Sequence, residues 1–313
     1  MKGLELSERF YLEYGAPMLR EQFPTLEGLV AVGLAGCGSE CFGYDDDISC
    51  DHDFEPGFCI FLPDEDIVSR RDAFALERAY AKLPSEFMGF KREKYDPVGG
   101  NRHGVIRMSD FFAEKCGSPQ GNLSKRDFFS VPEQSLAEAT NGKIFFDGLG
   151  RFGQIRSNLE YLPEDVRLKK LAGNLLLMGQ SGQYNYGRCI ARGETAAAQL
   201  SAIEFAKAAI HAIFLLNKRY LPYYKWTFHA LLELSRLSTL APLLEYLISS
   251  GNSPEEAEKK SATIETIARA IISELRALAL SDFCRDELEG HAYSVNNKIV
   301  DAEIRNLHIL YGV

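Results

Sequence analysis

The fold of the N-terminal half is decided by one stretch of sequence. It reads Gly28-Leu29-Val30-Ala31-Val32-Gly33-Leu34-Ala35-Gly36-Cys37-Gly38-Ser39 and continues, after eleven further residues, with Asp51-His52-Asp53. The apolar run at 28–35 predicts a short buried strand that ends at Gly36. Gly38 and Ser39 then predict a turn into a short helix, where backbone N–H groups and a hydroxyl can meet a phosphate. The apolar residues at 54–62 predict a second strand directly after the acidic pair.

The acidic pair suggests a metal site. Asp51 and Asp53 are two residues apart, so on an extended strand both carboxylates point to the same face. Two such carboxylates can hold Mg²⁺ ions that bridge the oxygens of a nucleoside triphosphate, neutralise the leaving pyrophosphate and align a nucleophile.

Each part of this pattern also has a simpler interpretation. A Gly-Ser pair alone is usually only a turn. An Asp-x-Asp close to Tyr44-Asp45-Asp46-Asp47 is usually a solvated loop, or a calcium-binding one. The complete order of strand, Gly-Ser, short spacer, Asp-x-Asp and second strand favours a site for a metal-bound triphosphate over these alternatives.

The rest of the N-terminal half alternates short apolar segments with amphipathic ones. Strands are predicted at 103–108 and 143–147, and Gly148 and Gly150 end the second of these. Helices are predicted at 5–22 and 64–83.

From about residue 151 onward the sequence shows long helical periods and almost no strand pattern. Helices are predicted at 163–179, 193–220, 222–236, 238–250 and 254–281. The last one begins with a capping box, in which Ser253 is the N-cap, Pro254 the first helical residue and Glu256 the partner three residues after Ser253. We therefore predict an α+β protein with a mixed-sheet α/β domain at 1–150 and an all-helical bundle domain at 151–313.

The composition is that of an ordinary folded protein. The 313 residues are 46% hydrophobic and 25% charged, which is enough for two domains with sizeable cores. The net charge of −9 and the pI of about 5.3 argue against an extended nucleic-acid surface, because such a surface needs a basic face.

The cysteines and the apolar segments indicate the compartment. The seven cysteines are scattered and include no C-x-x-C pair, which is typical of reduced thiols in a cytosol. The first residues lack the apolar core of a secretion signal. The most apolar helical segment, 200–216, contains Glu204, Lys207 and His211, so we expect a bundle helix there. We expect a cytoplasmic protein with no membrane partner.

Several segments together resemble a known family. They are Gly38-Ser39-Glu40 with Asp51-His52-Asp53, then 141–150 (NGKIFFDGLG), 180–186 (QSGQYNY) and 216–226 (LNKRYLPYYKW). The first is similar to the nucleotidyltransferase superfamily, especially the kanamycin- and streptomycin-type antibiotic nucleotidyltransferases. All of them together resemble an uncharacterised bacterial family, a domain of unknown function with that fold. The resemblance implies a nucleotidyltransferase-type N-terminal domain, a helical domain behind it and the triphosphate between them.

The superfamily generally uses a third carboxylate on a later strand as the base for the acceptor hydroxyl. The strand at 103–108 contains no acidic residue, and Asp110 lies just beyond it. Asp147 ends the next strand before a glycine-rich turn, where backbone can approach a ligand. We predict Asp147 as the third catalytic carboxylate beside Asp51 and Asp53, with a turn-forming role as the alternative.

Two segments of the helical half offer further candidates. In Tyr220-Leu221-Pro222-Tyr223-Tyr224-Lys225-Trp226, Lys225 could bind a triphosphate phosphate while the tyrosines stack on a ring. The alternative there is an aromatic domain interface with a snorkelling lysine. Arg188 could meet an anion from a polar loop at 180–188, or belong to an ordinary helix–helix loop. We interpret Lys169 and Lys170 as solvated helix charges.

The sequence thus predicts a Mg²⁺-dependent enzyme that transfers AMP from ATP to a hydroxyl and releases pyrophosphate. Gly38 and Ser39 would hold the phosphates, with Lys225 and Arg188 from the helical half, while Asp51 and Asp53 hold the metal. The acceptor is open and could be a small molecule, a protein side chain or an RNA end. The rival hypotheses are a non-catalytic module that binds nucleotide and metal, and an antitoxin-like partner of a toxin.

Overall fold

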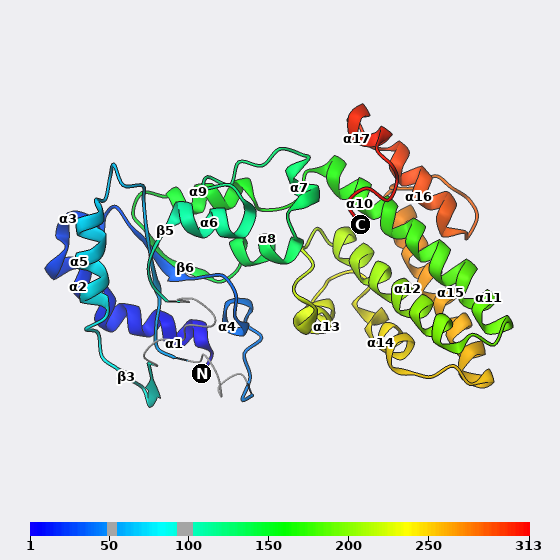
Figure 1. The fold of residues 1–313 in the computed structure, drawn as a ribbon, viewed down its shortest axis with the longest axis horizontal. Coiled ribbons are helices and arrows are strands. Elements are labelled where there is room, and N and C mark those ends of the chain that lie inside the picture. Colours follow the sequence, from blue (N-terminus) through cyan, green and yellow to red (C-terminus); the bar gives the residue numbers. More distant parts are fainter. Residues whose placement is uncertain (49–54, 93–102) are drawn as a thin grey trace. The chain divides into compact units, whose positions relative to one another are not determined.

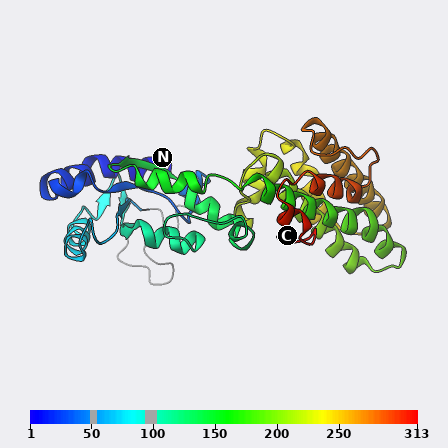
Figure 2. The same cartoon turned by 90° about the horizontal axis from the view of Figure 1, so that it is seen from above.

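The computed structural model describes residues 1–48, 55–92 and 103–313, and the chain forms two compact units. Unit 1 comprises 1–124 and 131–160, and unit 2 comprises 125–130 and 161–313. Figure 1 shows the elements along the chain. The strands all belong to unit 1 (Figure 2), and the part of unit 2 that the structure describes contains only helices and their connections. The protein is therefore α+β, with one mixed unit and one helical unit.

Unit 1 is built on a small mixed sheet whose strand order is β5-β2-β1-β6. The central strand β1 runs antiparallel to both of its neighbours, whereas β2 and β5 are parallel. A separate two-stranded hairpin joins β3 to β4. The bounds are β1 Ala31–Leu34, β2 Cys59–Leu62, β3 Glu86–Phe87, β4 Phe90–Lys91, β5 Gly104–Arg107 and β6 Lys143–Asp147.

Both faces of the sheet are covered, which explains why β1 and β2 are apolar at every position rather than alternating. On one face Val32 and Ile60 join the core formed by α1 (Gly3–Phe10), α2 (Ala16–Gln22) and α5 (Arg70–Tyr80). On the other face the Phe61 ring packs 5.2 Å from that of Phe111 and 4.4 Å from that of Phe152.

Those two phenylalanines come from α6 (Met108–Cys116) and α9 (Arg151–Asn158). In Figure 1 the strands lie between α1 on one side and α6 and α9 on the other. The shorter helices of this unit are α3 (Pro24–Glu27), α4 (Ser39–Phe42) and α8 (Glu133–Thr140).

The helix predicted at 5–22 is interrupted by a π-helical turn, η1 (Tyr11–Gly15), between α1 and α2. Gly15 lies against the Phe58 ring, and a Cβ there would come within 2.9 Å of Phe58 Cε1. The wider turn thus places a glycine where a side chain would collide with the Phe58 ring.

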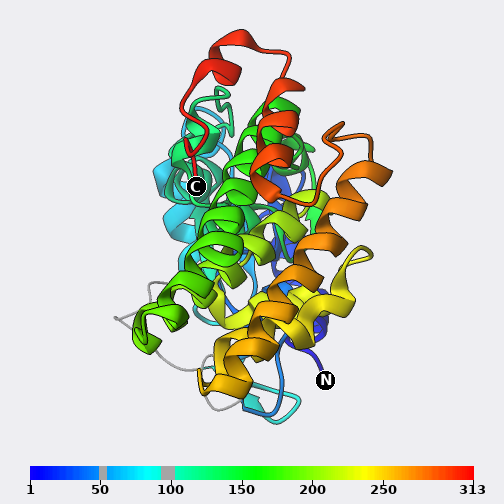
Figure 3. The same ribbon diagram turned by 90° about the vertical axis from the view of Figure 1, so that its right-hand side faces the viewer.

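Unit 2 is a bundle around a long helical rod (Figure 3). The rod consists of α10 (Glu164–Met178), the π-helix η3 (Gly179–Tyr186) and α11 (Gly187–Ala191). The loop predicted at 180–188 is therefore wrong, because the helix continues through it with a wider turn. α10 packs against α12 and α16, and α12 also packs against α14 and α15. The other helices are α12 Thr195–Leu216, α13 Tyr224–Leu232, α14 Ala241–Ser249, α15 Pro254–Ala277, α16 Leu288–Asn297 and α17 Ala302–Asn306, with a short 3₁₀ turn, η4, at Ser238–Leu240.

The α12 helix is long and apolar enough to cross a membrane by length and composition alone. In this structure it packs among the other helices of unit 2, with 61% of its most apolar window buried. The predicted bundle helix at this position is confirmed. The capping box at the start of α15 is confirmed as well, since Ser253 and Glu256 exchange both expected hydrogen bonds.

Lys169 is buried inside unit 2, and so is Lys170, so the prediction of solvated charges is wrong. Lys169 Nζ donates hydrogen bonds to Asn296 Oδ1 (2.8 Å) and to the carbonyl oxygens of Arg305 (3.1 Å) and Leu307 (2.7 Å). Burial lowers the pKa of this ammonium group. The charge is tolerated because three oxygens replace its water, and it holds the C-terminal segment onto α10.

The chain passes between the two units after residues 124, 130 and 160. The segment 125–130, which contains α7 (Asp127–Ser130), belongs to unit 2. Lys125 Nζ binds Asp165 (2.8 Å) and Asp301 (2.9 Å), Phe128 is buried, and the Phe129 ring packs 5.0 Å from that of Tyr311. The predicted domain boundary at 150 lies inside unit 1, directly before α9. The chain enters unit 2 for the last time ten residues later, after residue 160.

Candidate functional site

The glycine–serine corner lies between β1 and the one-turn helix α4. Gly36 has φ 117° and Gly38 has φ 128°, a conformation that only glycine adopts without strain. A Cβ at Gly38 would come within 2.7 Å of the Glu40 carboxylate carbon. The two glycines therefore let the chain turn sharply just before Ser39, which is half-buried.

Asn141, which lies 105 residues after Gly36 in the sequence, holds this corner in place. Its Oδ1 accepts a hydrogen bond from Gly36 N (2.9 Å), and its Nδ2 donates one to Gly36 O (2.8 Å). The next residue continues the pairing, since Gly142 N donates to Cys41 O at 2.9 Å. Both polar backbone groups of a buried glycine are thus satisfied by one side chain, which makes the turn rigid.

Arg156, on α9, holds Asn141 in turn. Its guanidinium donates to the Asn141 carbonyl oxygen and to Ala139 O (3.2 Å), and it stacks 4.9 Å over the Phe152 ring. Burial lowers the pKa of Arg156 to about 10. The buried Arg156 cation therefore holds the segment 139–141, and this segment in turn holds the corner. No sequence motif indicated this role for Arg156.

The strand register shows which end of the sheet the corner occupies. The last β1–β2 pair is Gly33 with Cys59, so the corner continues from β1 at the end where β2 begins. Asp51 and Asp53, the predicted metal ligands, lie outside the described residues. Glu55 is the first described residue on the strand side of that gap.

Glu55 forms a side-chain contact with His103 that the sequence did not reveal. His103 Nδ1 lies 3.1 Å from Glu55 Oε1, and both side chains are largely buried. The imidazole fills the space beside Gly57, where a Cβ would come within 2.8 Å of Nδ1. Because β5 is parallel to β2 and Gly104 pairs with Cys59, this carboxylate–imidazole pair lies at the same end of the sheet as the corner. The two residues are 48 apart in sequence, and only the pairing of β2 with β5 brings them together.

Asp147 lies at the opposite end of the sheet, so the structure does not bring it to Ser39. It pairs with Ala31 at the start of β1, whereas Lys143 is the β6 residue that pairs with Leu34 near the corner. Asp147 Oδ2 instead accepts a hydrogen bond from Gly153 N (2.9 Å) and caps α9. Asp110 follows the C-terminal end of β5 and is likewise at that far end. The prediction of Asp147 as the third carboxylate is corrected, because β6 runs antiparallel to β1.

Lys225 is the second residue of α13 in unit 2, and it is exposed. Its Nζ lies 4.8 Å from the centroid of the Trp226 ring, which is a cation–π contact. Pro222 precedes the helix as predicted, and Tyr223 and Tyr224 stand exposed beside the lysine.

Arg188 is exposed on α11. Its Nη1 donates to the Tyr184 hydroxyl (2.8 Å), and its guanidinium lies 4.7 Å from the Tyr184 ring centroid. The contact spans one helical turn, so the arginine is an ordered surface cation rather than part of a loop.

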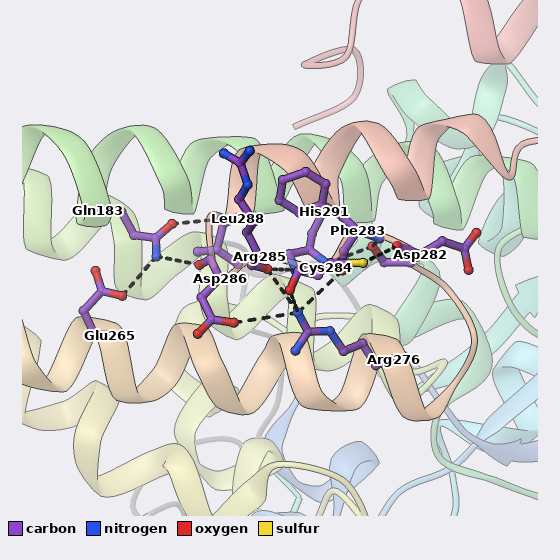
Figure 4. Close-up of polar contacts among 11 residues, drawn as sticks. Gln183, Glu265, Arg276, Asp282, Phe283, Cys284, Arg285, Asp286, Leu288 and His291 are labelled. Atoms are coloured by element: carbon purple, nitrogen blue, oxygen red, sulfur yellow. Dashed lines mark hydrogen bonds and ion pairs between the residues drawn. The ribbon is translucent and has the colours of Figure 1, made fainter.

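Gln183, in the same polar segment, has an internal role (Figure 4). Its Nε2 donates to Glu265 Oε2 (3.1 Å) and Asp286 O (3.1 Å), while its Oε1 accepts from Leu288 N (2.9 Å). One amide on the π-helix thereby connects α15, the loop at 281–287 and the start of α16. The sequence suggested that the polar side chains of this segment could bind a ligand. Gln183 instead uses its amide for contacts inside unit 2.

The remaining chemistry concerns metal ions. Within 1–48, 55–92 and 103–313 no cluster of three or more His, Cys, Asp or Glu side chains could hold a metal ion. The described groups around the corner include the Ser39 hydroxyl and the Glu40 carboxylate, whose Oγ and Oε2 lie 3.5 Å apart. Hydroxyl and carboxylate oxygens are ligand types that Mg²⁺ prefers, but these two residues alone do not make a metal site.

Part of the chain matches a known family. Residues 128–227 match a family described as a domain of unknown function, DUF4037. The matched residues include Asn141, Arg188 and Lys225 but not the corner at Ser39. The predicted likeness to an uncharacterised family is therefore supported over this part of the chain. No curated protein matches the sequence.

Proposed function

We propose that this protein is a Mg²⁺-dependent nucleotidyltransferase that moves AMP from ATP onto a hydroxyl of an acceptor and releases pyrophosphate. The observation that carries the proposal is the rigid glycine–serine corner. It stands at the end of β1, its Gly36 is held by both polar atoms of the Asn141 side chain, and it lies at the end of the sheet where β2 begins. The acidic pair lies a few residues before that strand in the sequence.

In this proposal Gly38 and Ser39 hold the phosphates through backbone N–H groups and the Ser39 hydroxyl. The α4 helix has only four residues, so its dipole contributes little and these local donors must do most of the binding. Asp51 and Asp53 would hold Mg²⁺, which neutralises charge on the triphosphate when bound. Their role is inferred from the sequence.

The acceptor hydroxyl needs a base at the same end of the sheet. Asp147 lies at the other end, and the Glu55–His103 pair lies at the correct one. We therefore assign the pair this role in place of Asp147. A carboxylate that orients an imidazole through Nδ1 is a common arrangement for proton transfer.

The test measures pyrophosphate release from ATP and Mg²⁺ in the presence of fractionated cell extract, together with ATP affinity by calorimetry. The wild-type protein should release pyrophosphate, and Asp51→Asn and Asp53→Asn should each reduce release by about a hundredfold or more, as expected for loss of transition-state charge stabilisation. Asp66→Asn is the matched control, because Asp66 is an exposed carboxylate beyond the opposite end of β2. If Asp51→Asn and Asp53→Asn released pyrophosphate as fast as the wild-type protein and Asp66→Asn, the proposal would be rejected.

A second function is favoured by one observation. The predicted catalytic carboxylate Asp147 is absent from the corner end of the sheet. A non-catalytic module that binds nucleotide and metal would need no base. In that case ATP should bind with an affinity that depends on Asp51 and Asp53, but no extract fraction should give pyrophosphate release.

A further inference from the structure

Unit 2 exposes aromatic and cationic side chains at the start of α13 and in the segment just before it. We call this group the aromatic patch, and it consists of Lys218, Arg219, Tyr223, Tyr224 and Lys225. Tyr224 is 76% exposed and Tyr223 is 40% exposed. The two rings lie side by side, with centroids 4.2 Å apart and planes inclined by 45°.

The fold of α13 does not require these side chains. The helix is anchored by its other face, where Thr227, Ala230 and Leu231 are buried. Tyr224 stays 76% exposed, so its ring contributes little buried apolar area to folding. Such surface is typical of an interaction site.

The charge of the patch differs in sign from that of the whole chain. The segment 217–226 contains three cations and no acidic residue, while the complete sequence has a net charge of −9. Lys218 pairs with Glu164 at 3.5 Å, but its side chain stays 62% exposed. Lys225 and Arg219 are exposed as well. An anionic partner with flat apolar groups would therefore match the patch in both charge and shape.

We propose that the aromatic patch binds the end of a short single-stranded polynucleotide. Unstacked bases present flat faces that stack on tyrosine rings whatever their sequence, and the backbone phosphates between them pair with lysine and arginine. A duplex fits poorly, since its bases already stack on one another. Lys225 then contacts a backbone phosphate, which replaces the role in triphosphate binding that the sequence suggested. The site is local, so it agrees with the acidic surface elsewhere.

Binding can be measured directly by fluorescence anisotropy with the full-length protein. The probes are labelled RNA and DNA single strands of the same sequence, about ten nucleotides long to cover one site of this kind, and a duplex of the DNA strand. The slope of log affinity against log salt should be about −2, because each phosphate neutralised on a single strand contributes about −0.7. The RNA and DNA arms show whether the 2′-hydroxyl is recognised in addition to the shared stacking and phosphate chemistry.

Substitutions then locate the site. Tyr224→Ala should weaken binding about fivefold to a hundredfold, the range for loss of one stacked base. Lys225→Ala should weaken it and make the salt slope shallower by about 0.7. The matched controls are Tyr293→Ala and Lys259→Ala, which remove an exposed tyrosine and an exposed lysine elsewhere in unit 2. Because Tyr224 is exposed, its replacement should leave the melting temperature unchanged, so a loss of binding cannot be attributed to unfolding.

Several results would overturn the inference. They are no binding of either single strand at low salt, equal losses in the control variants, or tighter binding of the duplex. If Tyr224→Ala weakened ATP binding as strongly as oligonucleotide binding, the ligand would be a mononucleotide and the inference would fail. None of these measurements requires nucleotidyl transfer, so the proposed enzymatic function is judged separately.

Discussion

Replacing Asn141 by alanine tests whether the glycine–serine corner is held by this one side chain. The substitution removes both hydrogen bonds to Gly36 and leaves the N–H and C=O of that buried glycine without their partners. Each lost bond costs about 0.5–1.5 kcal/mol, with a further desolvation cost for groups that stay buried. We therefore expect the free energy of unfolding of unit 1 to fall by about 2–4 kcal/mol.

The melting temperature and the affinity for ATP report different consequences. A loss of this size lowers the melting transition of a unit of this length by about 5–15 °C. ATP affinity should fall as well, because the backbone N–H groups beside Ser39 are no longer fixed in place before binding. Differential scanning calorimetry and isothermal titration calorimetry measure the two quantities on the same sample.

Two further variants make this test specific. Asn141→Asp keeps the acceptor for Gly36 N but cannot donate to Gly36 O, so it should lie at or below the alanine variant in stability. Asn158→Ala is the control, since it removes an asparagine of unit 1 whose amide bonds, at 3.3 Å, are exposed. If Asn141→Ala had the same melting temperature and the same ATP affinity as the wild-type protein, the corner would not depend on Asn141 and this reasoning would be refuted.

Three other predictions follow from single features of the structure. Asp147→Asn should retain pyrophosphate release and lose about 1 kcal/mol of stability or less, the usual scale for weakening a helix cap; a loss of activity with intact folding would restore Asp147 to the site. His291 is buried, its Nε2 donates to Arg285 O (2.8 Å), and burial lowers its pKa below the ordinary 6.5. As the pH falls, the unfolded chain therefore takes up the proton before the folded protein does. The stability contributed by neutral His291 is complete above pH 6.5 and is lost as the pH falls through the lower folded pKa. Melting temperatures measured between pH 8 and pH 5 should therefore decline less for His291→Gln than for the wild-type protein. Lys169→Met should destabilise unit 2 by about 2–4 kcal/mol because it removes the donor to Asn296 Oδ1, Arg305 O and Leu307 O, of which Arg305 O keeps a hydrogen bond from Asn296 Nδ2 (3.3 Å). An unchanged denaturant midpoint would show that water replaces the ammonium group.

The strands were predictable because their residues are apolar and bounded by glycines. β6 coincides with the segment predicted at 143–147, and β5 lies within 103–108. The direction of pairing was not predictable, since nothing in a short apolar segment specifies which neighbour it takes or in which sense. This is why Asp147 was expected near Ser39 although the antiparallel β6 places it at the other end. Similarly, Glu55 and His103 become neighbours only through the β2–β5 pairing.

In the helical half, periodicity predicted the long elements but not the polar ones. The segment 180–188 lacks an apolar stripe and contains two glycines, so a loop was expected. Gly182 lies against Phe205, where a Cβ would come within 2.8 Å of the ring, and the chain passes this contact as a π-helix. Lys169 was misjudged because a lysine is normally exposed, and sequence alone cannot show three oxygens converging on it.

The repeated passage of the chain between units 1 and 2 has a practical consequence for dissecting this protein. A fragment that ends at residue 160 would still carry Phe128 and Phe129 but would lack Tyr311, whose ring packs against that of Phe129, and the rest of unit 2. A fragment that starts at 161 would lose Lys125, the cation shared by Asp165 and Asp301. We therefore expect neither fragment to fold stably on its own. A single protease cleavage near residue 160 should leave the two pieces associated, because segment 125–130 of the first piece packs in unit 2.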